Sequence, residues 1–503
     1  MNCFKKTPRL GLLNLLVMMV LFPFTAQSQQ TRRIPLTLEE VVETAREQSQ
    51  ASLIAKHNFL ASYWQFRSYK AKLLPSLNLN ASLGQYNRSI TALQNSQTGE
   101  FNYIVNNNMN NNLSLSVNQS IAPTGGTLSL ITSLSRLDQF SSQNPVTYTS
   151  QPVKINYSQP IKAYNSLKWE KTIEPLNFEK AKREYLERLE DVNITAVSLF
   201  FSVLSAQINL DMALKNLENT ELSLDIAKER FEIGTISRND VLTLNLRLIN
   251  SRLDIGDKQL ELEMSKLNLR TFLGFNESVE LVLITPEQTP DLTLNYEDVY
   301  SRSIENSSYV MGNELLLLGA EQSVARAKSS TGLQANLFAN FGLNQRGENL
   351  SKAYSNPMDQ EVVGLSLTLP ILDWGMGKGN VKLARSREEV IRTQVEQSMT
   401  QYKQDVLIKV MQFNKLNDQC NISLQADSIA KLSFDIANER FRNGTITVIE
   451  LNSAQNDMTS AASRYIADLG NYWKNYYNIR KLSLYDYLTD KGVSVNFDLL
   501  TEN

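Results

Sequence analysis

The sequence predicts a mainly helical fold with membrane β-strands, in which duplicated, long coiled-coil helical hairpins carry strands that contribute to a shared transmembrane β-barrel. Three observations predict this fold. One half of the chain repeats the other, each half contains a very long helical stretch that ends in the same short turn, and short segments alternate apolar with polar residues. The alternation has the period of two that a strand with one apolar face requires.

Composition excludes several classes of protein. The 503 residues carry 50 Lys and Arg against 52 Asp and Glu, so a broad basic surface for nucleic acid is not expected. His57 is the only histidine, which rules out multi-histidine zinc sites and a histidine-based catalytic triad within one chain. No nucleophile and base pair stands out in the sequence. We therefore expect no enzyme activity, no metal site and no cofactor.

The N-terminus has the pattern of a secretory signal peptide over residues 1–28. Three cations precede an apolar run over 10–24, and small residues follow it, so the mature chain is expected to begin near Gln29. A membrane anchor is the alternative, although the run is short for a helical span. Cys3 precedes this run and cannot carry a lipid on the mature chain, which leaves Cys420 without a disulfide partner. No later segment approaches 18 consecutive apolar residues, so no inner-membrane helix is expected.

Two halves, 29–290 and 291–503, repeat the same order of elements. The segment 225–236 reappears at 435–446 with nine identities in twelve positions. Each half begins with a long helix. The first is predicted from the capping box of Thr37 and Glu40 to Leu74, before Pro75, and its counterpart over about 295–328.

Strands follow each of these helices. Alternating segments at 77–83 and 113–117 in the first half, and at 363–369 in the second, are predicted strands. Extra residues in the first half add a strand pair at about 127–137 and 152–159, which gives four strands in the first half and two in the second. The polar stretches 85–112, 138–151 and 344–361 are predicted as long outer loops. Six strands are too few to enclose a lumen, so copies must share one barrel; a soluble secreted sandwich with helical stalks is the alternative.

Long helices come next, predicted from Pro175 to about Phe231 and over about 377–441. Each reaches a turn of sequence Arg-Phe-x-x-Gly-Thr, in which the glycine ends one helix and the threonine is predicted to cap the next. A returning helix follows each turn. In the first one an alternating spacing of three and four residues, with one step missed at Glu263, predicts a coiled-coil seam of Leu242, Leu246, Ile249, Leu253, Gly256, Leu260 and Leu267.

The order of elements and the two turns, 230–235 and 440–445, make the chain similar to the TolC-like outer-membrane efflux proteins. This resemblance implies a homotrimer in the outer membrane of a Gram-negative bacterium, with pooled strands in one barrel and helices that form a periplasmic tunnel. It also implies a periplasmic adaptor (membrane fusion) protein and an inner-membrane pump of the resistance-nodulation-division or ABC type. The family usually has four strands per chain, so the extra pair is a departure and would give 18 strands in a trimer.

The resemblance also implies roles for residues of the two turns. Adaptor docking falls on Arg230, Phe231, Gly234, Thr235, Arg440, Phe441, Gly444 and Thr445. The alternative is that the phenylalanines pack within their own helix pairs and the arginines cap carbonyls. The family narrows its tunnel with acidic residues six positions past each turn glycine, which are Asp240 and Glu450 here, although Ser453 replaces a second acidic residue of tighter gates. A solvated carboxylate at a helix start is the alternative.

The function expected on this basis is a passive exit duct for small molecules, driven by a partner pump. One alternative is the outer-membrane component of a type I protein secretion system, which would have the same architecture. Another, from a different class, is a secreted helical structural or adhesive protein.

Overall fold

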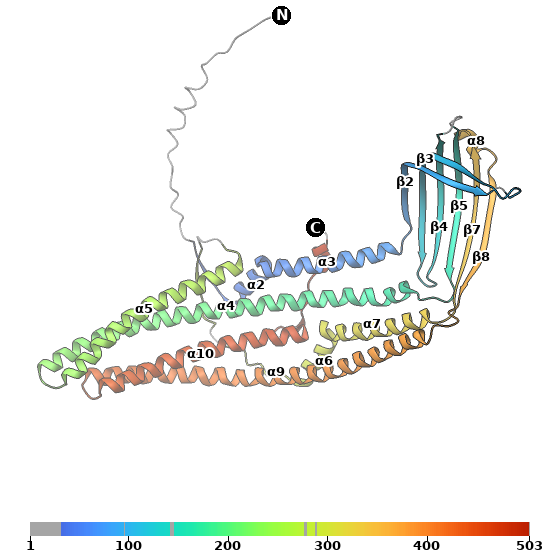
Figure 1. Cartoon of the computed structure of the whole chain (residues 1–503). Coiled ribbons are helices and arrows are strands. Elements are labelled where there is room, and N and C mark those ends of the chain that lie inside the picture. The colour runs from blue at the N-terminus through green and yellow to red at the C-terminus, as the bar shows by residue number, and fades with distance from the viewer. Residues whose placement is uncertain (1–31, 95, 141–144, 276–278, 287–288, 502–503) are drawn as a thin grey trace, which may run out of the picture.

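The computed structural model describes residues 32–94, 96–140, 145–275, 279–286 and 289–501. The predicted signal peptide and its cleavage point lie outside these residues. Long helices run side by side in an elongated body, and a curved sheet stands at one end of them (Figure 1). The helical body and the sheet are therefore separate layers joined by short connections.

The sheet has six strands in the order β2-β3-β4-β5-β7-β8, and every neighbouring pair is antiparallel. Four strands precede the first long helix and two follow it, as the alternating segments predict. The strands are β2 (Ser76–Gln94), β3 (Phe101–Ile121), β4 (Gly126–Gln139), β5 (Val146–Pro160), β7 (Gln334–Gly347) and β8 (Met358–Thr368). Within the described residues, the outer edges of β2 and β8 have no strand partner, so the sheet is open.

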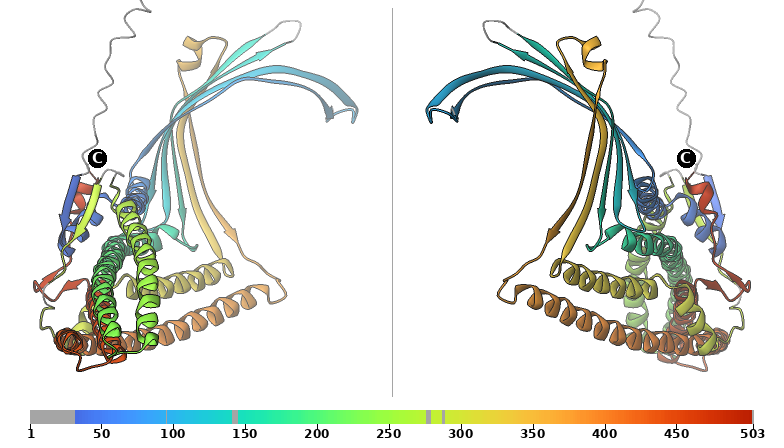
Figure 2. Two further views of the ribbon diagram at one scale, coloured as in Figure 1. Left: turned by 90° about the vertical axis from the view of Figure 1, so that its left-hand side faces the viewer. Right: turned by 90° about the vertical axis from the view of Figure 1, so that its right-hand side faces the viewer.

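The loops predicted between these strands are wrong in extent. Most of 85–112 is strand, because β2 and β3 pair from Ser76↔Asn118 out to Gln94↔Phe101. A bulge between Ser82 and Gln85 shifts the register by one residue, and the β2–β3 hairpin then arches away from the other strands (Figure 2). The turn between β7 and β8 holds a short helix, α8 (Leu350–Tyr354).

The first helix of each half is broken in two, which corrects the prediction of one continuous helix. In the first half α2 (Leu38–Gln48) and α3 (Gln50–Lys72) meet at Ser49, and in the second α6 (Tyr296–Asn306) and α7 (Ser308–Ser330) meet at Ser307. Both serines have extended backbones and accept a hydrogen bond from the next helix as N-caps. The predicted capping box of Thr37 and Glu40 is present.

Four helices build the length of the body. The long ones are α4 (Ser166–Glu232) and α9 (Met376–Arg442), each of 67 residues, and the returning ones are α5 (Arg238–Leu273) and α10 (Val448–Ser483), each of 36. At about 1.5 Å per residue the long helices extend about 100 Å. Helix α4 begins at Ser166, so the predicted start at Pro175 is wrong and the proline lies inside the helix.

Short elements complete the chain. Parallel strands β1 (Arg32–Leu36) and β6 (Val279–Leu283) join the start of the described chain to the segment after α5. After α10 come a small antiparallel pair, β9 (Tyr485–Asp486) and β10 (Lys491–Gly492), and a last helix, α11 (Phe497–Thr501). Phe497 contacts the rings of Phe59 and Tyr185 and so ties the C-terminus to α3 and α4.

The main core lies in the middle of the helical body. Helix α4 contains a stretch long and apolar enough to cross a membrane, which the sequence prediction did not anticipate. Val197, Phe200 and Leu204 of this helix are fully buried, in one apolar cluster with Phe413 of α9 and Leu469 of α10. These side chains belong to the 39% of the apolar stretch that is buried within the chain, and each gains roughly 1.5–3 kcal/mol when it leaves water.

The predicted seam on α5 does not face the chain's own helices. Leu246, Leu253 and Leu260 are 61, 66 and 62% exposed, whereas Leu244, Leu262 and Leu269 of the same helix are buried. Helix α5 therefore has two apolar stripes. One packs within the chain, and the predicted seam forms an exposed stripe.

Candidate functional site

The two helical hairpins, α4–α5 and α9–α10, turn at the end of the body farthest from the sheet (Figure 1). Their turns have the same backbone hydrogen bonds. Thr235 donates its backbone N–H and its hydroxyl to the carbonyl oxygen of Arg230, at 2.9 and 3.0 Å, and Thr445 does the same to Arg440 at the same distances. This is the Schellman arrangement that satisfies the last carbonyls of a helix.

Glycine is required at the centre of each turn. Gly234 and Gly444 have φ angles of 75° and 77°, in the left-handed region that side chains disfavour. Their N–H groups donate to the carbonyl oxygens of Phe231 and Phe441, at 3.0 and 2.9 Å. The repeated sequence thus produces one turn geometry twice.

Arg230 joins the two turns. Its Nη2 donates to the carbonyl oxygens of Phe441 and Arg442, at 2.9 and 2.8 Å, and its guanidinium lies 5.4 Å from the centre of the Phe441 ring. The alternative that an arginine caps carbonyls is therefore correct for Arg230. The carbonyls belong to the other hairpin, a pairing that the sequence did not predict.

The repeated residues differ in exposure. Phe441 is buried in the core at the tip, together with Leu224, Leu244 and Leu451, whereas Phe231 is 44% exposed. Arg440 is also exposed, and within the described residues no hydrogen bond or ion pair of its side chain is found. Phe231 and Arg440 are thus the large side chains of the two motifs that remain exposed, beside the exposed Gly-Thr pairs of both turns.

The acidic residues Asp240 and Glu450 both close capping boxes, whose N-caps are Ser237 and Thr447. The prediction that the turn threonines cap these helices is therefore wrong, because their hydroxyls donate back to the preceding helix. Asp240 accepts hydrogen bonds from the backbone and hydroxyl of Ser237, at 3.1 and 2.7 Å, and Glu450 accepts the equivalent bonds from Thr447, at 2.7 and 2.9 Å. The bonds from Thr447 lower the pKa of Glu450, so this exposed side chain is charged at neutral pH. In each carboxylate one oxygen accepts both capping hydrogen bonds, and the other oxygen accepts neither of them.

A groove of about 710 Å³ lies between the two turns. Its lining brings together residues that the sequence placed in two separate motifs, among them Arg230, Gly234, Gly444, Asp240 and Glu450. Phe231 and Arg440 do not line it. The docking and gate residues predicted from sequence therefore meet at one surface, with these two exceptions at its margin.

A polar network beside the tip was not predicted from the sequence. Arg247 of α5 donates to Gln455 of α10 at 2.9 Å, and Gln455 donates to Asn216 of α4 at 2.5 Å. Gln455 is buried. The three residues are far apart in sequence and belong to no motif, so only the packing of the helices brings them together.

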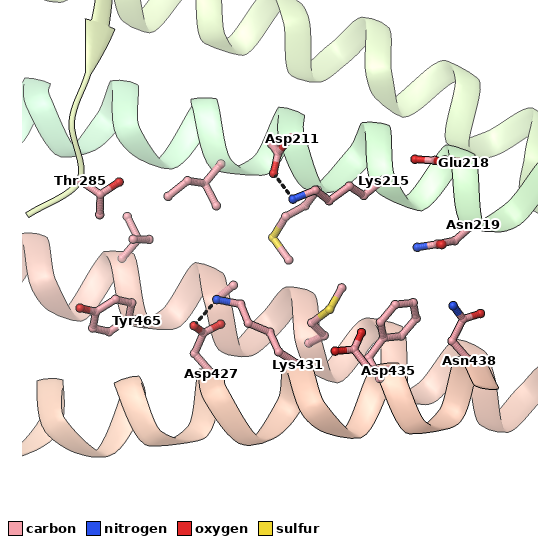
Figure 3. Close-up of a pocket in the computed structure, with 16 residues that line it drawn as sticks. Asp211, Lys215, Glu218, Asn219, Thr285, Asp427, Lys431, Asp435, Asn438 and Tyr465 are labelled. Carbon is pink, nitrogen blue, oxygen red and sulfur yellow. Dashed lines mark hydrogen bonds and ion pairs between the residues drawn. The ribbon is translucent and has the colours of Figure 1, made fainter. Parts of the chain in front are cut away.

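A second groove, of about 690 Å³, follows α4, α9 and α10 farther along the body. Figure 3 shows ion pairs on opposite walls, Asp211 with Lys215 at 2.8 Å and Asp427 with Lys431 at 2.6 Å. Apolar side chains such as Met212, Phe434 and Met458 also line the groove. Charged walls around apolar residues suit an amphipathic helix, and no sequence motif marked this surface.

Known proteins resemble this chain in sequence and in fold. A family model described as "Outer membrane efflux protein" matches residues 41–275 and 299–483, which include both turns. No curated protein sequence matches the chain significantly.

Three solved structures share the fold over nearly the whole chain. The CmeC outer membrane channel of Campylobacter jejuni is 15% identical, with a TM-score of 0.64, and the match covers 92% of this chain and 89% of that one. The outer-membrane channel OprN is 15% identical, with a TM-score of 0.63 and 89% of each chain covered. The outer membrane protein VceC of Vibrio cholerae is 14% identical, with a TM-score of 0.61 and coverage of 91% and 97%.

Proposed function

The chain belongs to the outer membrane efflux protein family, and we propose that it is the exit duct of a tripartite efflux system, through which small molecules leave the cell. The protein resides in the outer membrane and its helical body extends into the periplasm. In the proposal the duct makes and breaks no bonds, because transport through a wet lumen depends on its shape and electric potential.

The open sheet is the observation that carries the proposal. The free edges of β2 and β8 run in opposite directions, so β2 of one copy can pair antiparallel with β8 of the next. Unpaired edges are not tolerated in lipid, which favours closure by further copies. Three copies with six strands each give a barrel of 18 strands. The exposed apolar stripe on α5 supports the same assembly, because a helix of a neighbouring copy could cover it in the helical wall.

The tip is the proposed docking site for a periplasmic adaptor. Phe231 and Arg440 are accessible there, and aromatic and arginine side chains are favoured anchors in protein interfaces. The groove between the turns and the groove along α4, α9 and α10 extend this surface. An inner-membrane pump of the resistance-nodulation-division or ABC type would supply the energy.

Asp240 and Glu450 are the proposed constriction. In a threefold assembly each carboxylate would recur three times around the axis, and a ring of negative charge favours cations over anions. Their capping role does not oppose this one, because the capping hydrogen bonds go to one oxygen of each carboxylate and leave the other unused by the cap.

The function is tested in a strain that lacks the gene. We expect this strain to accumulate fluorescent dyes and to become sensitive to toxic small molecules, and the intact gene to reverse both effects. A strain that exports small molecules normally but retains a secreted protein would instead favour type I secretion. Recovery of the protein in the soluble fraction without detergent would contradict an outer-membrane duct and favour a secreted structural protein.

A further inference from the structure

The β2–β3 hairpin is longer than a membrane barrel requires. Strand β8 spans 11 residues, close to the roughly 9–11 that cross a bilayer, whereas β2 spans 19. Strand β4 pairs with β3 only from Asn108 onwards, so residues 88–94 and 101–107 form a two-stranded ribbon beyond the rest of the sheet. We call these residues the distal ribbon.

One face of the distal ribbon is apolar and uncovered. The cross-strand pairs Ile90↔Val105 and Ala92↔Tyr103 place these side chains on one face, and Ile90, Val105 and Tyr103 are 69, 58 and 73% exposed. The other face carries mainly polar residues, such as the pair Ser89↔Asn106. An isolated two-stranded ribbon is marginally stable in water, so an exposed apolar face on it calls for a partner.

The bulge gives the ribbon its direction and keeps its apolar face continuous. Gly84 at the bulge has a φ of 68°, and its N–H donates to Oδ1 of Asn111 at 2.7 Å. Before the bulge, odd-numbered residues of β2 such as Leu77 and Leu79 lie on this face. After the register shift, even-numbered residues of β2 lie on the same face. Beyond the bulge the hairpin arches sideways (Figure 2).

A matching surface exists at the outer end of β8. Leu350, Tyr354 and Met358 are 50, 47 and 70% exposed there, on and beside α8. Helix α8 is held against the sheet, because Ala353 is fully buried and its carbonyl oxygen accepts a hydrogen bond from Ser150 of β5. This patch is therefore a preformed apolar surface.

The two surfaces lie at the same height when copies pair edge to edge. Ser76 begins β2 and Thr368 ends β8, both next to the helical body, and ten residues outward from each lie Tyr86 and Met358. A neighbour's β8 therefore runs out where the distal ribbon begins. The connection between the neighbour's β7 and β8, which holds α8, would therefore stand next to the ribbon in place of the bilayer, since 11 residues already span the hydrocarbon.

We propose that the distal ribbon is an intersubunit clasp, whose apolar face packs on Leu350, Tyr354 and Met358 of the next copy of this chain. The inference rests on the proposed assembly and adds a contact outside the barrel wall. The clasp would hold adjacent copies together on the outer side of the membrane.

The test is cross-linking between differently tagged copies in the Cys420→Ser background. One copy carries Ile90→Cys and the other Tyr354→Cys, so that only links between copies join the two tags. We expect mild oxidation to give covalent dimers at least several-fold more often than the matched control, Ser89→Cys with Tyr354→Cys, whose cysteine lies on the opposite face of the ribbon.

Two outcomes would overturn the clasp while leaving the duct in place. The first is an intact threefold assembly in which both pairs cross-link equally or not at all. The second is a benzophenone probe, attached to the new thiol of the Ile90→Cys variant, that labels lipid or lipopolysaccharide and not another copy. A protein that is monomeric in detergent would instead overturn the proposed assembly and the clasp with it.

A second measurement uses stability. Ile90→Asn with Val105→Asn should lower the temperature at which the assembly dissociates in detergent by several degrees, because it removes the apolar face. Ser89→Asn with Thr91→Asn, on the opposite face, should not change it. Equal dissociation temperatures for the two double variants would count against the clasp.

Discussion

Arg230 gives the tip its asymmetry. The same arginine occurs in both turns, yet only Arg230 reaches the carbonyls of the other hairpin, and Arg440 stays exposed. The sequence predicts both turns and their glycines, because the left-handed position depends on local geometry. It does not predict which arginine crosses over, since that depends on how the two hairpins pack against each other.

Arg230→Ala is expected to loosen the tip without unfolding the protein. Hydrogen bonds from charged donors contribute roughly 1.5–3 kcal/mol, and their loss leaves two carbonyls at the end of α9 without this donor. We expect faster amide hydrogen exchange around Gly444 and faster proteolysis at the second turn. Arg440→Ala is the matched control, and an equal effect of the two variants would argue against the bridge.

Glu450 can be tested for charge and cap separately. Glu450→Gln keeps a side chain that can complete the capping box but removes the charge, whereas Glu450→Ala removes both. In planar bilayers we expect both variants to lose cation preference, and Glu450→Ala to unfold at a lower temperature than Glu450→Gln, because it loses the cap as well as the charge. Unchanged selectivity in both would remove Glu450 from the constriction.

The pH dependence of Glu450 has a definite sign. Its folded pKa is lowered, so the stability it contributes is present above the unfolded value and is lost as the pH falls through the folded value. Cation preference should therefore persist as the pH falls through the usual range of a glutamate and disappear only below it. Current measurements in the parent protein and in Glu450→Gln, across that range, check this expectation.

At the scale of elements, the sequence predicts the kind of element better than its ends. Residues 85–112 look like a loop because asparagine is rare in strands, but cross-strand pairing over the whole hairpin outweighs that preference. Pro175 suits the first turn of a helix, yet Asn165 caps α4 ten residues earlier. Tertiary packing decides such positions, and a local pattern does not contain it.

Ser49 marks the break between α2 and α3, which a continuous pattern concealed. Its side chain accepts a hydrogen bond from the N–H of Ser52 at 3.1 Å, and the residue is fully buried. Ser49→Ala should lower the free energy of unfolding by about 1 kcal/mol through loss of this cap. Ser428→Ala, at an exposed position inside α9, is the control and should be neutral in thermal unfolding; equal losses would mean that Ser49 is no special cap.

At the scale of the whole molecule, the single chain is incomplete. In the part of the chain that the structure describes, the sheet has two free edges, and α5 exposes a stripe of leucines along the body. Sequence alone predicts the seam, because its spacing is regular, but it cannot say whether the partner helix comes from the same chain. Only the burial of the other stripe of α5 within the chain distinguishes the two cases.

Leu246→Asp should prevent assembly without unfolding the chain. Leu246 is 61% exposed, so a charge there costs little in one copy but would be buried between copies. We expect the variant to elute from detergent columns at the mass of one copy, with the helix content unchanged in circular dichroism. Asn245→Asp adds a charge at the next, exposed position and should still give the mass of three copies; an assembled Leu246→Asp variant would place the interface elsewhere.

The equal lengths of corresponding helices set a limit on how this chain can change. Helices α4 and α9 each have 67 residues, and α5 and α10 each have 36, so the two hairpins have the same length. Removing seven residues from each arm of one hairpin alone would leave its turn about 10 Å short of the other, beyond the reach of Arg230. Natural insertions and deletions in these helices should therefore occur in matched sets, one in each half of the gene.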